Sequence, residues 1–294
     1  MNLHRSNRVK ALVLASFASM AFGIGAAASE RLPALRVVQS GHSLTDGVIG
    51  PLEIMVRVTS MRGGKLDKAT IPGSPMEWRW ENASNPDIRQ PEVMARYDVL
   101  AITERVALTN TMDHHDSKHW ALHWASHAWE HGANGDGARS VLYASWVDIE
   151  SGSGFENRHN DPEGHLTFRE RLPLEMVRWQ SILDHVNANR PDGMPEMDMI
   201  PGPLIMARAY DEIASGTAPG LNDIHDLFSD SIHPNKMGNY LIALAHFAVI
   251  YDGDPRGLPP TMLTQGGPDK VQAAWMQEIV WDVLNEYAET SGGP

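Results

Sequence analysis

The chain has 294 residues, no cysteine and a formal charge of −13, because 37 acidic residues outweigh 24 lysines and arginines. The lack of cysteine excludes a disulfide scaffold, a thiolate zinc site and a cysteine nucleophile. The acidic balance argues against a nucleic-acid partner, since binding to a phosphate backbone rests on clustered lysine and arginine. With 42% hydrophobic and 21% charged residues, the composition is that of a folded globular protein.

The first 28 residues have the pattern of a cleavable export signal. Three cations without an acid precede residues 11–28, which carry no charge and end in three alanines. A basic start, an apolar middle and a small-residue exit are features of a secretory signal peptide. The alternative, a membrane anchor, fits less well because the apolar part is short and rich in alanine, glycine and serine. We expect cleavage after Ala28, leaving residues 29–294 as a single periplasmic or secreted domain that has no membrane partner.

Four short apolar runs predict strands at Leu35–Gln39, Tyr97–Thr103, Ala138–Trp146 and Met197–Ile200. Helical patterns lie between and after them, at Ser117–His131, Leu174–Asn189, Leu204–Ser215, Asn235–Tyr251 and Val271–Tyr287. Apolar strands that alternate with helices are typical of a parallel sheet with both faces covered. We therefore expect an α/β fold, a three-layer α/β/α sandwich around a central, mostly parallel sheet.

A polar, glycine-rich segment, residues 149–165, follows the third predicted strand. Loops at the carboxyl ends of parallel strands line the ligand crevice of such folds. We expect this segment to be a loop beside the cleft. A solvated excursion away from the cleft is the alternative.

The first predicted strand runs into Gly41-His42-Ser43-Leu44. A serine on a tight turn after a strand exposes its hydroxyl at the carboxyl edge of the sheet. Because serine is a weak nucleophile, it needs a neighbouring base. Ser43 is therefore a candidate nucleophile, and the alternative is a serine that only caps the following helix.

A second motif lies near the other end, where Asp230 precedes His233 by three residues and Pro234 follows. At this spacing the carboxylate can bind one imidazole nitrogen and leave the other free to take a proton from a serine. The same carboxylate stabilises the imidazolium that then forms. The alternative is an aspartate that caps a helix beside an incidental histidine.

Together, G-x-S-L near the start and D-x-x-H-P near the end resemble the SGNH/GDSL superfamily of serine hydrolases, and residues 231–251 look like its last block. The resemblance implies an SGNH/flavodoxin-like fold and an esterase that works through an acyl-enzyme. It implies Ser43 as the nucleophile, His233 as the general base and then acid, and Asp230 as the residue that orients the imidazole. It implies no metal ion and no cofactor.

The sequence departs from the family pattern around the oxyanion hole. His42 stands where the family has an aspartate. The family's second block supplies a glycine amide, for which Gly73 is the best match alongside the amide of Ser43. The third block supplies an asparagine after a strand, and Asn110 is the nearest candidate here. Because a missing oxyanion donor costs ~10²–10³ in rate, the altered block predicts a slow enzyme, a displaced donor or no enzyme.

Histidines recur at four-residue steps along the predicted helix 117–131. Two imidazoles at this spacing can share a metal ion, and Asp113 or Asp116 can complete such a site. The alternative is a polar flank on a helix whose tryptophans and alanines are buried.

Four further residues are candidates for substrate binding. His114 and His115 follow a predicted strand of the sheet, so we expect them to reach the cleft and bind a polar substrate. Trp78 and Trp146 lie at predicted cleft edges, where an indole can stack on a sugar ring, although core packing is the usual role of tryptophan.

We therefore predict an exported esterase whose partner is a small-molecule or carbohydrate ester. Two alternatives from other classes stay open. One is a non-catalytic carbohydrate-binding or polysaccharide-assembly module on the same scaffold, which the altered third block motivates. The other is a metal-dependent hydrolase built on residues 113–131.

Overall fold

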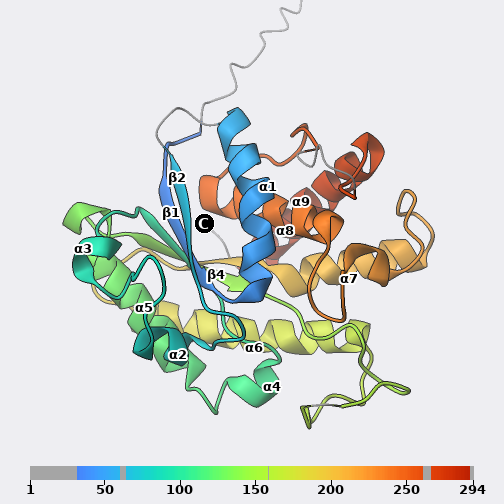
Figure 1. Cartoon of the computed structure of the whole chain (residues 1–294), viewed down its shortest axis with the longest axis horizontal. Helices are drawn as coiled ribbons and strands as arrows, with labels where there is room; N and C mark the ends of the chain where they lie inside the picture. Colours follow the sequence, from blue (N-terminus) through green and yellow to red (C-terminus); the bar gives the residue numbers. More distant parts are fainter. Residues whose placement is uncertain (1–31, 60–63, 158, 261–265, 292–294) are drawn as a thin grey trace, which may run out of the picture. The chain divides into compact units, whose positions relative to one another are not determined.

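A five-stranded sheet forms the centre of the computed structural model, which describes residues 32–59, 64–157, 159–260 and 266–291 (Figure 1). All neighbouring strands are parallel, and their spatial order is β2-β1-β3-β4-β5. The strands are β1 (Arg36–Gly41), β2 (Lys65–Thr70), β3 (Val99–Ile102), β4 (Arg139–Ala144) and β5 (Asp198–Pro201). The predicted α/β fold is confirmed, and the four predicted strands are present with ends displaced by one or two residues.

Strand β2 is not predicted from the sequence, because three of its six residues are charged and it lacks an apolar run. It pairs with β1 alone and so forms an edge of the sheet. Charged side chains are common on edge strands, since they discourage pairing with other chains.

Helices lie between the strands and after the last one. They are α1 (Ser43–Thr59), α2 (Met76–Glu81), α3 (Pro91–Met94), α4 (Leu108–Thr111), α5 (Ser117–His131), α6 (Phe168–Asn189), α7 (Gly202–Ala214), α8 (Lys236–Tyr251) and α9 (Lys270–Ser291), with short 3-10 turns η1 (Ala133–Gly135) and η2 (Ile224–Leu227). Helix α5 has its predicted bounds. Helix α6 begins at Phe168 rather than at Leu174, because Thr167 and Glu170 cap each other ahead of Pro173.

Alternate residues of the strands face two separate cores. On one face, Val37 and Tyr143 belong to a core with residues of α1, α7, α8 and α9. On the other face, Val38 and Leu142 belong to a core with residues of α2, α3, α5 and α6. Figure 1 shows these two groups of helices on opposite sides of the sheet. Because both faces are covered, the inner strands are apolar along their length.

The parallel strands end at one edge of the sheet, so the segments that follow them gather there. Ser43 follows β1, Glu104 and Arg105 follow β3, and residues 145–167 follow β4. These segments carry most of the candidate site.

No helix in the described ranges is long and apolar enough to cross a membrane. The predicted signal peptide, residues 1–28, lies outside the described residues, so cleavage and export stay predictions.

Helices α1 and α8 approach one another closely at Gly47. A Cβ atom at this position would lie 2.4 Å from Oδ1 and 2.6 Å from Cγ of Asn239, so any larger residue there displaces the Asn239 side chain. Asn239 in turn donates from Nδ2 to the carbonyl of Pro234 at 3.0 Å. The contact therefore fixes the start of α1 relative to the residues just ahead of α8.

Gly47→Ala should destabilise the protein by ~1–3 kcal/mol, because the added methyl group displaces the Asn239 amide. Gly50→Ala is the matched control in the same helix, since no atom lies within 4 Å of its Cβ position. It should stabilise the protein by ~0.5–1 kcal/mol through helix propensity. Urea unfolding followed by circular dichroism measures both, and equal midpoints for the two variants would contradict the close contact.

Candidate active site

Ser43 is the first residue of α1 and follows the end of β1 by two residues. The turn between them is tight, with the N–H of Thr45 bonded to the carbonyl of His42 at 2.9 Å. A Cβ atom at Gly41 would lie 2.1 Å from Oγ1 of Thr45, which explains the glycine before the serine. The fold thus holds the Ser43 hydroxyl at the carboxyl edge of the sheet.

His233 stands on a short loop that is closed at its base. Phe228 and Pro234 form an antiparallel bridge. Ser229 donates from its N–H and from Oγ to the carbonyl of His233, at 2.8 and 3.0 Å. Asn235 then caps the first turn of α8 with its side chain. Backbone and side-chain bonds together therefore hold this Asp230–His233 loop in one conformation.

Three side chains form a continuous chain of hydrogen bonds. Nε2 of His233 lies 2.8 Å from Oγ of Ser43, although the two residues are 190 positions apart. Nδ1 of His233 lies 2.8 and 3.0 Å from the two carboxylate oxygens of Asp230. Because a carboxylate can only accept, Nδ1 donates to it, and Nε2 is left as an acceptor that faces the hydroxyl. The residues that the two sequence motifs nominate are thus brought together.

The carboxylate of Asp230 is held in its ionised form. Burial raises its pKa, but the backbone N–H groups of His233 and Ile232 and the imidazole of His233 together hold that pKa below its usual range. The same two N–H groups donate to Oδ1 at 2.7 and 2.9 Å. The side chain is 55% exposed, so water screens its charge.

His42 occupies the position at which the SGNH pattern has an aspartate, and it is buried. Its Nε2 donates to the carbonyl of Glu104 at 3.0 Å. Burial, and then the charge of Arg79, lower the pKa of His42 to about 4, so the ring is neutral at neutral pH. His42, in place of the aspartate of the SGNH pattern, therefore provides a neutral N–H donor that connects the turn after β1 to the segment after β3.

A fully buried arginine, Arg79 of α2, joins the ends of three strands. It donates to Oγ of Ser40 at 3.2 Å, to the carbonyl of Ser74 at 2.5 Å, and to the carbonyl of Thr103. Burial lowers the pKa of Arg79 to about 10 while the charge of Glu104 opposes that shift, so the side chain is a cation at neutral pH. The sequence gives no signal for this role, because two of the three acceptors, Ser40 and Thr103, lie 39 and 24 residues away in the chain.

Gly73 lies in a turn that follows β2. The N–H of Ser74 bonds to the carbonyl of Ile71 at 3.3 Å, and Gly73 at the third position has a φ of 64°. A positive φ at this position is the requirement of a type II turn. Gly73 and Ser43 line the same cavity.

Asn110, the third residue expected at the oxyanion hole, also lines this cavity. Its Nδ2 donates to the carbonyl of His159 at 3.1 Å. One amide hydrogen is left for another acceptor, because a side-chain amide carries two.

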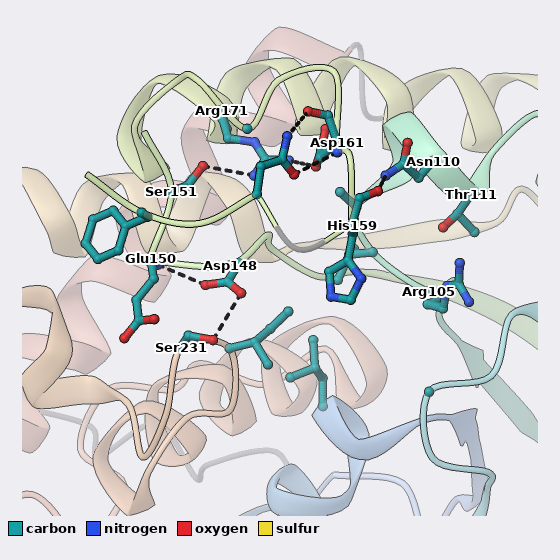
Figure 2. Close-up of a pocket in the computed structure, with 18 of the residues that line it drawn as sticks. Arg105, Asn110, Thr111, Asp148, Glu150, Ser151, His159, Asp161, Arg171 and Ser231 are labelled. Atoms are coloured by element: carbon teal, nitrogen blue, oxygen red, sulfur yellow. Dashed lines mark hydrogen bonds and ion pairs between the residues drawn. The ribbon is translucent and has the colours of Figure 1, made fainter. Parts of the chain in front are cut away.

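Ser43 and His233 line a cavity of about 730 Å³ (Figure 2). One wall comes from the segment after β3, namely Arg105, Val106, Ala107, Asn110, Thr111 and His114. Another comes from the segment after β4, namely Asp148, Glu150, Ser151, Phe155, Glu156, Asn157, His159, Asp161 and Gly164. Much of the segment 149–165 therefore lies beside the cleft.

A buried ion pair fastens this loop to α6 (Figure 2). Arg171 pairs with Asp161, with side chains only 3% and 9% exposed, and donates to Oγ of Ser151 at 3.0 Å. Thr109 donates to the second oxygen of Asp161 at 2.8 Å. Loss of one partner from such a pair costs ~3–5 kcal/mol, because a buried charge is left alone. The pair therefore makes the loop a fixed wall of the cavity.

Three hydrogen bonds tie the chain after β4 to the Asp230–His233 loop. Nε1 of Trp146 donates to the carbonyl of Ile232 at 3.1 Å. The N–H of Ile149 donates to the carbonyl of Ser231 at 2.7 Å, and Oγ of Ser231 donates to Asp148 at 3.0 Å. Burial raises the pKa of Asp148.

Of the four residues expected to bind substrate, His114 alone lines the cavity. His115 bonds to Glu77 instead, with 2.6 Å between Nδ1 and Oε2. Trp78 is 50% exposed but lies outside the lining. Trp146 is 0% exposed, so the expectation that its ring stacks on a sugar is wrong. Its indole is needed in the core, where it supports the Asp230–His233 loop.

The histidines of α5 pack against tryptophans. The ring of Trp80 meets those of His123 and His127 edge-on, with centroids 4.1 and 5.2 Å apart. Within the ranges that the structure describes, no group of three His, Cys, Asp or Glu side chains could hold a metal ion. His127 is itself buried and donates from Nε2 to the carbonyl of Ile88 at 2.9 Å, so it belongs to the packed side of α5 and not to a polar flank.

No family model matches this chain, and no curated protein matches it. A solved structure of a DUF4886 family protein from Bacteroides uniformis ATCC 8492 is similar to it with a TM-score of 0.58 and 11% identity, over 85% of this chain and 95% of the other. At that identity the likeness concerns the fold alone.

Two further structures are similar at lower scores. A protein described as a putative SGNH hydrolase from Slackia heliotrinireducens has a TM-score of 0.47 and 15% identity, over 75% of this chain and 100% of the other. The lipase Lip_vut3 from a goat rumen metagenome has a TM-score of 0.35 and 15% identity, over 74% and 98%. The parallel five-stranded sheet is consistent with the SGNH fold that the two end motifs imply.

Proposed function

We propose that this chain is a serine esterase that cleaves carboxylic esters through an acyl-enzyme. The observation that carries the proposal is the chain of hydrogen bonds from Ser43 Oγ through His233 to Asp230, with 2.8 Å at each step. A nucleophile, a base and an orienting carboxylate at such distances are what a serine hydrolase requires. The cavity of about 730 Å³ beside them has the size of a small-molecule site.

The chemistry follows from the positions of the three side chains. Ser43 Oγ attacks the ester carbonyl while Nε2 of His233 takes its proton, and Asp230 stabilises the imidazolium. The tetrahedral intermediate then collapses, and the leaving alcohol receives that proton. Water then enters, gives a proton to the same imidazole and attacks the acyl carbon with its oxygen. The bond from that carbon to Ser43 Oγ breaks, the acid leaves, and Oγ takes the proton back from His233.

Backbone amides provide the oxyanion hole in this proposal. The N–H of Ser43 at the start of α1 and the N–H of Gly73 are the main donors, and Asn110 adds a side-chain amide. Helix α1 supports the same charge, because the N-terminus of a helix is electropositive. His42 and Arg79 hold the two loops that carry these amides.

The lining of the cavity supports a polar ester rather than a long acyl chain. Hydroxyl, amide and charged side chains make up much of the wall, and Phe155 is its one aromatic side chain apart from histidine among the described lining residues. An O-acyl group on a carbohydrate fits this lining. The leader expected from residues 1–28 extends the proposal to an enzyme that acts outside the cytoplasm.

Ser43→Ala should abolish hydrolysis of a simple acetyl ester and labelling by a fluorophosphonate probe, because it removes the oxygen that bonds to His233. Ser231→Ala is the matched control, since this serine lines the same cavity but bonds to Asp148. It should still be labelled. Near wild-type activity of Ser43→Ala would show the mechanism to be wrong, and a wild type that neither cleaves esters nor reacts with the probe would favour a non-catalytic binding module.

Asp230→Asn should lower kcat/KM ~10²- to 10³-fold, because the amide nitrogen donates to Nδ1 and turns Nε2 of His233 into a donor. The loss should be smaller than the ~10⁴ seen for the equivalent change in a buried triad, because water already screens the 55% exposed carboxylate. The measurement is kcat/KM on a p-nitrophenyl ester around neutral pH, where Asp230 stays ionised.

Asp223→Asn is the control for this variant, because Asp223 forms a similar exposed pair with His225 outside the cavity. It should keep the wild-type rate. An Asp230→Asn enzyme with an unchanged rate would remove Asp230 from the mechanism.

A further inference from the structure

The two ends of the cavity differ in charge. Figure 2 shows Arg105 and Thr111 at one end, and Asp148 and Glu150 at the other. Asp148 is already bonded to Ser231 and to the N–H of Glu150, at 3.0 and 2.9 Å. A bound molecule therefore meets a cation at one end and carboxylates at the other.

Arg105 is held by its backbone but not by its side chain. Its N–H bonds to Oε1 of the buried Glu104 at 2.7 Å. Within the described ranges, no hydrogen bond or ion pair reaches its half-buried guanidinium. By contrast, Arg79 and Arg171, the buried arginines near the site, both have several acceptors. An unpaired guanidinium on a cavity wall presents a planar set of donors suited to a carboxylate.

A second observation at the same end points to a ligand. Thr111 lines the cavity and is fully buried, yet its Oγ1 has no hydrogen-bond partner among the described residues. A buried hydroxyl without a partner costs free energy, which an oxygen of a ligand can recover. His114 lines this part of the wall as well and adds a ring nitrogen.

We propose that Arg105, Thr111 and His114 form an anion pocket that binds a carboxylate carried by the substrate, so that the enzyme prefers esters with a negative charge. The inference rests on the proposed esterase function. Charge-assisted bonds from a guanidinium to a carboxylate are strong and directional, and Asp148 with Glu150 repels the same anion from the opposite end. The net charge of −13 does not prevent binding, because distant charges are screened over ~8 Å at physiological salt.

Two pairs of esters test this preference, and each pair differs only in charge. The first is the mono-4-nitrophenyl ester of adipic acid and its uncharged primary amide, which place the charge on the acyl side. The second is 4-acetoxybenzoate and 4-acetoxybenzamide, which place it on the alcohol side. We expect wild type to prefer the carboxylate in at least one pair, and added salt to weaken that preference.

Arg105→Gln should reduce the ratio of kcat/KM for the carboxylate to that for the amide ~10- to 100-fold, and Arg105→Lys should restore part of it. Arg96→Gln is the control, because it removes the same charge from an exposed arginine outside the cavity. It should leave the ratio at the wild-type value.

Equal rates for both members of both pairs in wild type would overturn the anion pocket. So would an Arg105→Gln variant that loses activity equally on charged and uncharged esters, because Arg105 would then act on the reacting centre or on the fold. Failure of the esterase proposal looks different, since no ester is then cleaved and Ser43 is not labelled. In that case the affinity for 4-acetoxybenzoate is measured by calorimetry for Ser43→Ala and for the double variant Ser43→Ala/Arg105→Gln. Weaker binding by the double variant supports the anion pocket, and equal affinities contradict it.

Discussion

The close contact between α1 and α8 at Gly47 and Asn239 sets how near to one another the two helices that carry the site lie. Ser43 begins one helix, and His233 lies just ahead of the other, 190 residues later in the chain. Their hydrogen bond of 2.8 Å would be lost if the helices moved apart by about 1 Å, because bonds near 3.6 Å no longer qualify. A side chain at Gly47 forces such a movement or displaces Asn239. The chemistry therefore depends on a packing detail one turn away from the nucleophile.

Buried charges hold the rest of the site in place. Arg79 joins the segments after β1, β2 and β3, and Arg171 fastens the loop after β4 to α6. Removing such groups from water is costly unless every donor and acceptor is satisfied. Arg171 keeps a buried Nε–H without a partner among the described residues. The value of both arginines therefore lies in position rather than in net stability, because each guanidinium is bonded to acceptors from other elements. Among the residues that the structure describes, Arg105 differs from these two because its guanidinium lines the cavity without a protein partner.

The site residues that belong to short, contiguous sequence motifs can be predicted from the sequence. The turn after β1 needs Gly41 and presents Ser43, and the spacing of Asp230 and His233 suffices to pair them, so the two motifs identify three residues. Gly73 is predictable because a proline followed by a glycine favours a type II turn. The alternation of apolar strands and helices likewise predicts the parallel sheet.

Other features of the fold and the site depend on contacts between distant parts of the chain, and short sequence patterns do not predict such contacts. Arg79 and Arg171 look like surface arginines in the sequence, and their burial follows from acceptors supplied by other elements. Trp146 at a strand end can face a cleft or a core, and its bond to the carbonyl of Ile232 in the Asp230–His233 loop places it in the core. Strand β2 is not predicted, because the charged residues of this edge strand interrupt the apolar run that indicates a strand.

The most direct test of the account is to find the covalent intermediate. A 4-nitrophenyl dialkylcarbamate forms a carbamoyl-enzyme that hydrolyses slowly, so the adduct can be digested and located by mass spectrometry. The account predicts one carbamoyl group on the peptide that contains Ser43, with stoichiometric release of 4-nitrophenol. A carbamoyl group on any other residue, with Ser43 unmodified, would contradict it.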